Sequence, residues 1–154
     1  MELKIRHAKK EDLSGINEIA KQIQDLHVKL RPDIFVPNDV VISEERYKEL
    51  LKDGVVLVGE HDNRIISYAV CFVRNWDSPI MAKKKVLFVD AIGNDESCRN
   101  CGIGKKMMQY IIDYAKENAC DRVELQANAS NTNAIGFYEH IGMKEKSRTF
   151  EIDL

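Results

Sequence analysis

Apolar residues recur along this chain at spacings of three and four in several places, and each of these places predicts an amphipathic helix. The longest run extends over 11–30, where Pro32 then prevents the helix from continuing. A second helix is predicted over 43–51, with Ser43 as its N-cap. Two more are predicted over 102–118 and 131–141, the first with a methionine-rich apolar face that we expect to pack in the core.

Alternating or continuous apolar runs predict strands between these helices. Asp62 and Asn63 separate two such runs and predict a hairpin turn. The order of elements mixes hairpins with a strand–helix–strand crossover, so the fold class is α/β (α+β), with a mixed sheet flanked by helices. The predicted strands span 3–7, 55–61, 64–76, 85–92, 122–128 and 143–154, the last with a kink or turn near Glu145.

Length, charge and apolar content limit the kinds of partner that this chain is expected to bind. A chain of 154 residues fits a single domain over 1–154. The 23 Lys and Arg residues nearly balance the 25 Asp and Glu residues, so nucleic acid is not indicated as a partner. No apolar run approaches the ~20 residues of a membrane-spanning helix. We therefore expect a soluble, cytoplasmic protein without a membrane partner.

Candidate chemistry begins with a turn that joins a predicted strand to the helix over 102–118. Gly102 and Gly104 leave the amides at the helix start uncovered, and such amides, with the positive end of the helix dipole, bind phosphate. Arg99 and Lys105 add positive charge. A Walker A motif would require glycine at position 99, and the dinucleotide fingerprint would require glycine where Met107 stands, so neither motif fits.

Cys98 and Cys101 form a Cys-x-x-Cys pair inside this turn, a spacing also found in zinc and thiol redox sites. A structural zinc site needs four ligands, and no second pair accompanies this one. We interpret the spacing as incidental and expect no metal. A redox role for the two thiols stays an alternative.

Two sequence blocks carry a resemblance to a known family. The first is Arg99-Asn-Cys-Gly-Ile-Gly104, and the second is Asn131-Thr-Asn-Ala-Ile-Gly-Phe-Tyr-Glu-His-Ile-Gly-Met143. In this order they resemble the GNAT superfamily of acyl-CoA N-acyltransferases. The resemblance implies a mostly antiparallel sheet with one splayed parallel pair of strands, between which CoA enters. It also implies direct transfer of an acetyl group from acetyl-CoA, as co-substrate, to a primary amine of a small molecule or a protein.

The resemblance assigns residues to acetyl-CoA. The thioester and pantetheine arm would lie along the backbone of the strand before the turn, where Gly93 suits a bulge. Tyr138 matches the tyrosine that protonates the leaving thiolate, and a phenol pKa of about 10 against a thiol pKa of about 8.5 suits that role near neutral pH. The cofactor-binding set is Ile92, Gly93, Asn94, Arg99, Asn100, Cys101, Gly102, Ile103, Gly104, Lys105 and Asn131.

The sequence leaves the identity of the general base open. Related enzymes that act on ribosomal protein N-termini carry a glutamate where Gln126 stands, and an amide is no base. Glu124, on the same sheet face, and Asp90, on the neighbouring strand, are the candidates, with a water relay as the alternative. The resemblance places the acceptor near the loop after the first helix, which makes His27, Arg31 and Phe35 candidate substrate-binding residues.

Two other function classes remain. The lack of an obvious base is compatible with a CoA-binding sensor or partner module that has lost catalysis. A thiol redox or metal protein built on Cys98 and Cys101 is the third reading. Oligomeric state is not determined by the sequence, and a homodimer is among the alternatives.

Overall fold

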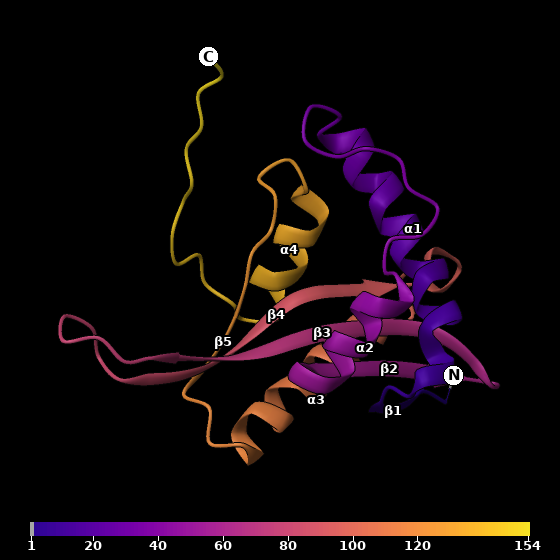
Figure 1. The fold of residues 1–154 in the computed structure, drawn as a ribbon, viewed down its shortest axis with the longest axis horizontal. Helices are drawn as coiled ribbons and strands as arrows, with labels where there is room; N and C mark the ends of the chain where they lie inside the picture. Colours follow the sequence, from indigo (N-terminus) through magenta and orange to yellow (C-terminus); the bar gives the residue numbers. More distant parts are fainter. Residues whose placement is uncertain (1) are drawn as a thin grey trace.

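The computed structural model describes residues 2–154 and is built on one five-stranded sheet (Figure 1). Neighbouring strands are antiparallel except for β4 and β5, which are parallel. This confirms the predicted mixed sheet with a single parallel pair. In their spatial order, the strands are β1 (Lys4–His7), β2 (Val55–His61), β3 (Arg64–Trp76), β4 (Lys84–Asn94) and β5 (Arg122–Leu125).

Helices cover both faces of the sheet (Figure 1). α1 (Leu13–Leu30) and α2 (Glu44–Asp53) bury apolar residues against one face of β2 and β3. α3 (Ile103–Glu117) buries its methionine-rich side against the opposite face, as predicted, and α4 (Thr132–His140) packs beside it. Short 3-10 turns, Lys10–Asp12 and Glu96–Cys98, precede α1 and follow β4. Within residues 2–154, no helix combines the length and apolar character that crossing a bilayer requires.

Local signals in the sequence correctly placed two boundaries. The Ser43 hydroxyl oxygen accepts a hydrogen bond from the Arg46 N–H at 3.1 Å, which caps α2 as expected. Asp62 and Asn63 both have positive φ, 48° and 61°. Two consecutive positive φ values are those of a type I′ turn, the connection that matches the twist of paired strands. The predicted hairpin between β2 and β3 is therefore confirmed.

The bulge in β4 lies three residues earlier than predicted. Val70 pairs with Ala91 and Cys71 pairs with Val89, so Asp90 is the extra residue on β4. Gly93 instead lies in regular register opposite Tyr68. A side chain at this position would crowd α1 and β3, because an ideal Cβ on Gly93 would overlap Cδ1 of Ile23 and lie 3.1 Å from Tyr68 Cε1.

Two predicted strand boundaries are wrong at the C-terminal end of the chain. β5 ends at Leu125 instead of Asn128, because its pairing with β4 ends at Val89 with Leu125. Residues 143–154, expected to form a strand, pair with no neighbouring strand, and they run away from the sheet as an extended segment (Figure 1). Alternating side chains suit a strand, but a strand exists only where a second backbone is in reach.

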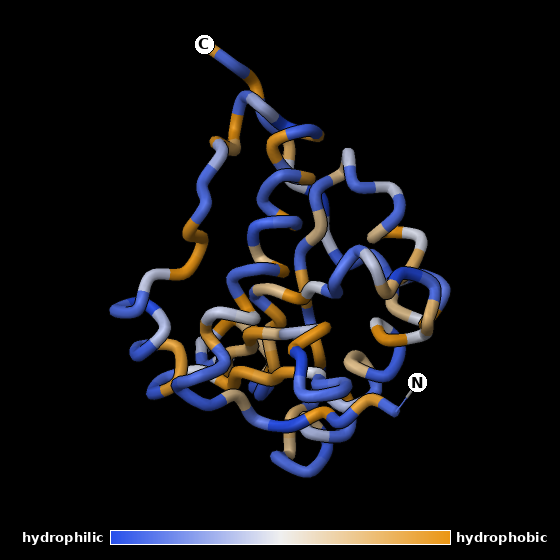
Figure 2. The backbone as a smooth tube through the Cα atoms, turned by 90° about the vertical axis from the view of Figure 1, so that its right-hand side faces the viewer, coloured by the Kyte–Doolittle hydropathy of each residue, from blue (hydrophilic) through white to orange (hydrophobic). Residues whose placement is uncertain are grey.

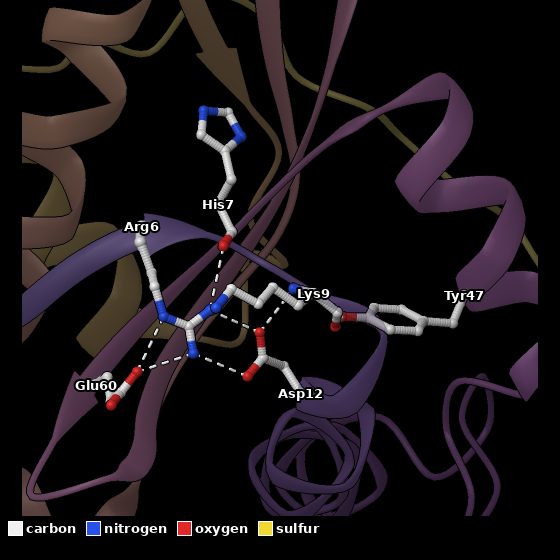
Figure 3. Close-up of polar contacts among 6 residues, drawn as sticks. All are labelled: Arg6, His7, Lys9, Asp12, Tyr47 and Glu60. Carbon is white, nitrogen blue, oxygen red and sulfur yellow. Dashed lines mark hydrogen bonds and ion pairs between the residues drawn. The ribbon is translucent and has the colours of Figure 1, made fainter.

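A polar cluster fastens β1, β2 and the start of α1 (Figure 3). The Arg6 guanidinium donates to both oxygens of Asp12, at 2.7 and 2.9 Å, and through Nε to Glu60 at 2.9 Å. The Lys9 N–H also donates to Asp12, at 2.7 Å, and the Tyr47 hydroxyl donates to the Lys9 carbonyl at the same distance. These ion pairs and hydrogen bonds hold α1 and α2 to the edge of the sheet, and each charged group among them has a partner of opposite charge.

Candidate functional site

An opening between β4 and β5 is the first feature of the site. The two strands pair at four positions, the last being Val89 with Leu125. The bulge at Asp90 follows at once, and from Ala91 to Asn94 β4 pairs with β3 alone. The edge of β4 that faces away from β3 therefore carries free backbone groups next to the start of α3. The structure thus shows the splayed parallel pair that the sequence predicted.

The turn between β4 and α3 presents a row of free amides. The Arg99 N–H bonds to the Glu96 carbonyl at 3.4 Å, and the next backbone bond is from the Lys106 N–H to the Gly102 carbonyl at 3.1 Å. Across residues 2–154, no acceptor bonds to the N–H groups of residues 100 to 105. Six consecutive free donors at the positive end of a helix are an arrangement that suits the binding of an anion by the backbone.

The conformation of this turn requires residues that tolerate positive φ. Gly102 has φ +74°, and no atom lies within 4 Å of an ideal Cβ placed on it. The space above Gly102 is therefore open to a ligand. Asn100 also has positive φ, 62°, a feature that the glycine pattern did not reveal. Asparagine tolerates positive φ better than most residues do. The turn can therefore have positive φ at two positions although only one of them is a glycine.

Positive charge surrounds the free amides. Arg99 and Lys105 are exposed, and in the described part of the chain no carboxylate lies within ion-pairing distance of either. Both cations are thus available to an anion bound at the turn, where they reinforce the helix dipole. Phosphate binding at this turn stays a prediction.

Two polar side chains fix the position of the turn before α3: Asn94, at the end of β4, and Asp95, directly after it. The Asn94 side-chain oxygen accepts a hydrogen bond from the buried Ser67 hydroxyl at 2.7 Å, and its Nδ2 lies 3.1 Å from an ideal Cβ on Gly104. Asp95 is 3% exposed and pairs with Arg64 at 2.6 Å. Burial opposes ionisation of Asp95, but hydrogen bonds from Ser97 and the charge of Arg64 hold its pKa below the ordinary value. Asn94 therefore links β3 to the start of α3.

Tyr138 lies half-buried on α4, which begins at the predicted cap. Asn131 Oδ1 accepts from the Ala134 N–H at 3.2 Å. The Tyr138 ring contacts Phe137 edge to face at 5.4 Å, and Phe137 in turn reaches within 3.3 Å of an ideal Cβ on Gly104. α4 is thus packed directly against the start of α3.

The Tyr138 hydroxyl is available for chemistry. It has no hydrogen-bond partner among residues 2–154. Burial raises its pKa, so the phenol stays protonated at neutral pH. A protonated, unpartnered phenol is a proton donor to a ligand in reach.

The two candidate bases differ in their surroundings. Glu124 is paired with Lys146 at 2.7 Å and with Arg122 at 3.5 Å, so its charge is already matched by two cations. Asp90, at the bulge, is exposed, and no cation in the described residues pairs with it. Of the two, Asp90 has the free carboxylate.

The residues expected near the acceptor lie at the end of α1. The rings of His27 and Phe35 pack with centroids 4.8 Å apart, and burial lowers the pKa of His27. His27 is therefore neutral at pH 7. Arg31 is engaged by Asp33 at 2.7 Å and by Glu151 at 2.6 Å, so its guanidinium is already matched by carboxylates.

Tyr68 is a buried titratable residue near the opening that the sequence pattern did not single out. It pairs with Gly93 across β3 and β4, and it is buried in the layer under α1. Burial, with the nearby charge of Asp90, raises its pKa to about 12. The alternation along β3 was the available signal, because it places Tyr68 on the same face as Val70.

The cysteines stay free thiols. Cys98 is half-buried and Cys101 is exposed. In the described part of the chain, no three His, Cys, Asp or Glu side chains are grouped so that they could hold a metal ion. The Cys101 thiol lies 3.6 Å from the Arg99 carbonyl, within the turn itself.

Comparison with known proteins identifies the family. The model of the acetyltransferase (GNAT) family matches residues 20–143, which include the turn, the opening and α4. The chain belongs to this family. The resemblance that two short blocks suggested therefore holds over most of the chain.

Relatives of this GNAT chain include a protein of Methanocaldococcus jannaschii named uncharacterized N-acetyltransferase MJ1207. It is 34% identical over 103 residues, which are 65% of this chain and 44% of that protein. The chain spans between 40% and 61% of the length of the first three curated relatives that it matches.

Solved structures share the whole fold. A mutant of the BH1408 protein from Bacillus halodurans has a TM-score of 0.94 and 29% identity, and the match covers 98% of this chain and 99% of that one. The aminoglycoside N-acetyltransferase AAC(6')-Iy, solved with a bisubstrate analogue that contains CoA, has a TM-score of 0.75 and 18% identity, and the match covers 100% and 99% of the two chains. At that identity, the second likeness concerns the fold alone.

Proposed function

We propose that this GNAT protein is an acetyl-CoA-dependent N-acetyltransferase, acting as a single domain over residues 1–154. The acetyl group passes directly to a primary amine of a small molecule or a protein, without an acyl-enzyme. The observation that carries the proposal is the row of six free amides at residues 100 to 105, next to the opening between β4 and β5. The proposal requires no metal ion.

The pyrophosphate of CoA occupies the turn before α3 in this proposal. The free N–H groups at residues 100 to 105 donate to its oxygens, and Arg99 and Lys105 balance its charge. The open space above Gly102 admits the phosphate to the backbone. The CoA group in the analogue bound by AAC(6')-Iy, a protein of the same fold, supports this choice of ligand.

The pantetheine arm and thioester then lie along the free edge of β4. From Ala91 to Asn94 this edge has no strand partner on the side of β5, so its amides and carbonyls are available to the amide groups of the arm. A backbone N–H at Ile92 or Gly93 serves the oxyanion that forms when the thioester carbon is attacked. These roles are carried by main-chain atoms, so they do not depend on the side chain at Asn94.

The neutral amine nitrogen attacks the thioester carbon, a C–N bond forms and the C–S bond breaks, which releases CoA as a thiolate. The Tyr138 hydroxyl gives its proton to that sulfur, and its raised pKa keeps it protonated beforehand. The amine proton leaves through a water relay, for which the unpaired carboxylate of Asp90 is a better terminus than Glu124. Solvent returns a proton to Tyr138.

Two measurements test the proposal. Calorimetry of the full chain with acetyl-CoA is expected to show one-site binding, and an absence of binding would overturn the assignment. A panel of amines, comprising polyamines, amino acids, aminoglycosides and peptides, is then incubated with acetyl-CoA, and free CoA is quantified by chromatography so that the protein's own thiols do not interfere. Acceptor-dependent CoA release supports transfer, whereas binding without release on any acceptor supports the sensor alternative.

A further inference from the structure

Two tyrosines are buried in the layer under α1 and α2, and their hydroxyl groups differ. Tyr47 is 2% exposed, and its hydroxyl donates a hydrogen bond to the Lys9 carbonyl at 2.7 Å. Tyr68 is 4% exposed, and no hydrogen bond joins its hydroxyl to any other group of residues 2–154. A buried phenol normally has a hydrogen-bond partner within the protein. The Tyr68 hydroxyl is therefore free to bond a ligand.

The oxygen of Tyr68 is not sealed inside the protein. In the described part of the chain, every fully covered nitrogen or oxygen of a side chain that is not exposed has a hydrogen-bond partner. Because the Tyr68 hydroxyl has none, its oxygen must still contact solvent although the ring beneath it is covered. Apolar residues surround this ring, and Figure 2 shows hydrophobic residues gathered in the inner part of the molecule, where the strands run. Tyr68 thus presents a single polar atom at the end of an apolar wall.

The Tyr68 side chain leans from β3 across β4. Tyr68 pairs with Gly93, and its Cε1 lies 3.1 Å from an ideal Cβ on that glycine, so the ring fills space that a side chain at Gly93 would take. The hydroxyl is attached to the ring carbon next to Cε1. The part of the chain that the structure describes places no strand beyond β4 at this level, because the pairing with β5 ends at Val89. The hydroxyl is therefore directed toward the opening between β4 and β5.

The face of the sheet on which Tyr68 lies decides which substrate it meets. Tyr68 and Ala91 pack in the layer that α1 covers, whereas α3 covers the opposite face (Figure 1). A cofactor held at the start of α3 enters the opening from the α3 face. The α1 side of the opening is left for the second substrate, so the Tyr68 hydroxyl faces the acceptor and not the cofactor.

One side of α1 leads from Tyr68 to the residues expected near the acceptor. Ile19 and Ile23 both approach the position of an ideal Cβ on Gly93, beside the Tyr68 ring. His27 follows Ile23 by four residues, so it lies on the same side of the helix. The apolar wall therefore continues from Tyr68 along α1 to the neutral imidazole of His27.

Asp90 lies close enough to the Tyr68 phenol to affect it. Burial, together with the negative charge of Asp90, raises the pKa of Tyr68 to about 12. The phenol is therefore protonated at neutral pH, with one proton to donate and lone pairs that accept. Asp90 is exposed at the bulge of β4, so water can join the two groups at the border of the opening.

We propose that Tyr68 binds the acceptor amine: its oxygen accepts a hydrogen bond from the amine N–H, and its hydroxyl donates to the water that leads to Asp90. This inference rests on the proposed acetyl transfer. The accepted bond turns the nitrogen lone pair toward the thioester carbon, and it strengthens as positive charge develops on the nitrogen during attack. No covalent bond of Tyr68 changes, and the amine proton still leaves through water to Asp90.

Tyr68→Phe is the direct test, because it keeps the ring and removes an oxygen that bonds to no other group of residues 2–154. The urea unfolding midpoint and the affinity for acetyl-CoA are expected to stay at their wild-type values. The value of kcat/KM for the acceptor is expected to fall about 10- to 100-fold, the range for one hydrogen bond to a group that becomes charged. The probe is the polyamine, amino acid, aminoglycoside or peptide with the fastest wild-type CoA release.

Tyr47→Phe is the matched control, since it removes a hydroxyl from the same layer that is bonded to Lys9 instead of facing the opening. It is expected to lower the unfolding midpoint and to leave kcat/KM unchanged. A wild-type kcat/KM in Tyr68→Phe would overturn the role of Tyr68 while acetyl transfer itself stands. Weaker binding of acetyl-CoA by Tyr68→Phe would overturn it too, because the phenol would then contact the cofactor. If the wild type releases no CoA with any amine, the proposed function fails, and the role of Tyr68 fails with it.

Fluorine NMR of protein labelled with 3-fluorotyrosine gives a readout that does not depend on turnover. The chain has five tyrosines, and Tyr68→Phe assigns the signal of Tyr68 by its loss. Adding the same amine to protein saturated with CoA, which has no acetyl group to transfer, is expected to shift the Tyr68 signal and to leave the Tyr47 signal in place. A Tyr68 signal that does not move at an amine concentration well above its KM would contradict the contact.

Discussion

Gly93 on β4 and Ile23 on α1 lie so close together that an ideal Cβ on the glycine would overlap Cδ1 of the isoleucine. The same Cβ would also lie 3.1 Å from Tyr68 Cε1 and 3.3 Å from Ile19 Cγ2. α1 is therefore seated directly on the part of β4 that borders the opening. The contact sets how far the helix lies from the proposed path of the pantetheine arm.

Gly93→Ala is expected to destabilise the protein by about 1–3 kcal/mol, because overpacking a filled core displaces its neighbours. Urea unfolding measures the change. Combining it with Ile23→Val removes the overlapping methyl group, so the double variant should lose less stability than the two single variants together, with a coupling of about 0.5–3 kcal/mol. If the changes in unfolding free energy were strictly additive, the result would show that the whole helix α1 moves, and not the Ile23 side chain alone.

Gly102→Ala is expected to cost about 1–2 kcal/mol, because a left-handed conformation strains any residue that carries a Cβ. It should also weaken acetyl-CoA binding, since the turn relaxes and moves its amides. Gly136→Ala is the matched control: Gly136 lies within α4, has no positive φ, and has no atom within 4 Å of an ideal Cβ. That control should stabilise the helix by about 0.5–1 kcal/mol and leave binding unchanged. Equal binding by both variants would speak against a role for the turn.

Tyr138→Phe is expected to lower the acetyl-transfer rate by about 100-fold, the low end of what a positioned proton donor contributes. Affinity for acetyl-CoA should change little, since the ring and its contact with Phe137 are retained. Steady-state kinetics and calorimetry, run on the same preparation, separate the two effects. An unaltered rate would exclude the hydroxyl as the proton donor.

The pH dependence of the rate gives a second check on Tyr138. Burial raises its pKa above the ordinary tyrosine value of about 10, so the proton-donating form persists throughout neutral pH. A loss of rate caused by its ionisation should therefore occur only above pH about 10 in the wild type. A fall in rate near pH 8 that Tyr138→Phe abolishes would contradict this placement.

Asp12→Asn is expected to destabilise the protein by about 1.5–3 kcal/mol at pH 7, because the carboxylate accepts hydrogen bonds from the Arg6 guanidinium and the Lys9 N–H (Figure 3). The bonds from Arg6, opposed by burial, hold the pKa of Asp12 below its ordinary value. A depressed pKa gives stability above the unfolded pKa of about 3.9 that is lost as pH falls through the folded value. The difference between wild type and variant should thus shrink toward pH 2, whereas Asp77→Asn, at an exposed and unpaired position, should have little effect at either pH.

Local patterns in the sequence were sufficient for most elements of the fold. Ser43 caps α2, Asp62 and Asn63 form the hairpin turn, and the apolar face of α3 is buried, because each depends on neighbours a few residues away in the chain. The free amides before α3 were predictable for the same reason: Gly102 and the start of α3 are consecutive, and free amides at a helix start are a local consequence of helix geometry.

Only the tertiary structure decided how separate segments meet. The register between β3 and β4 places the bulge at Asp90, and α1 limits the space beside Gly93. Glu124 forms an ion pair with Lys146, which is 22 residues away in the chain. The alternating residues of 144–154 have the pattern of a strand but no strand beside them. A side-chain period describes one backbone alone, whereas pairing, ion pairs and close packing need a second segment whose position the period does not contain.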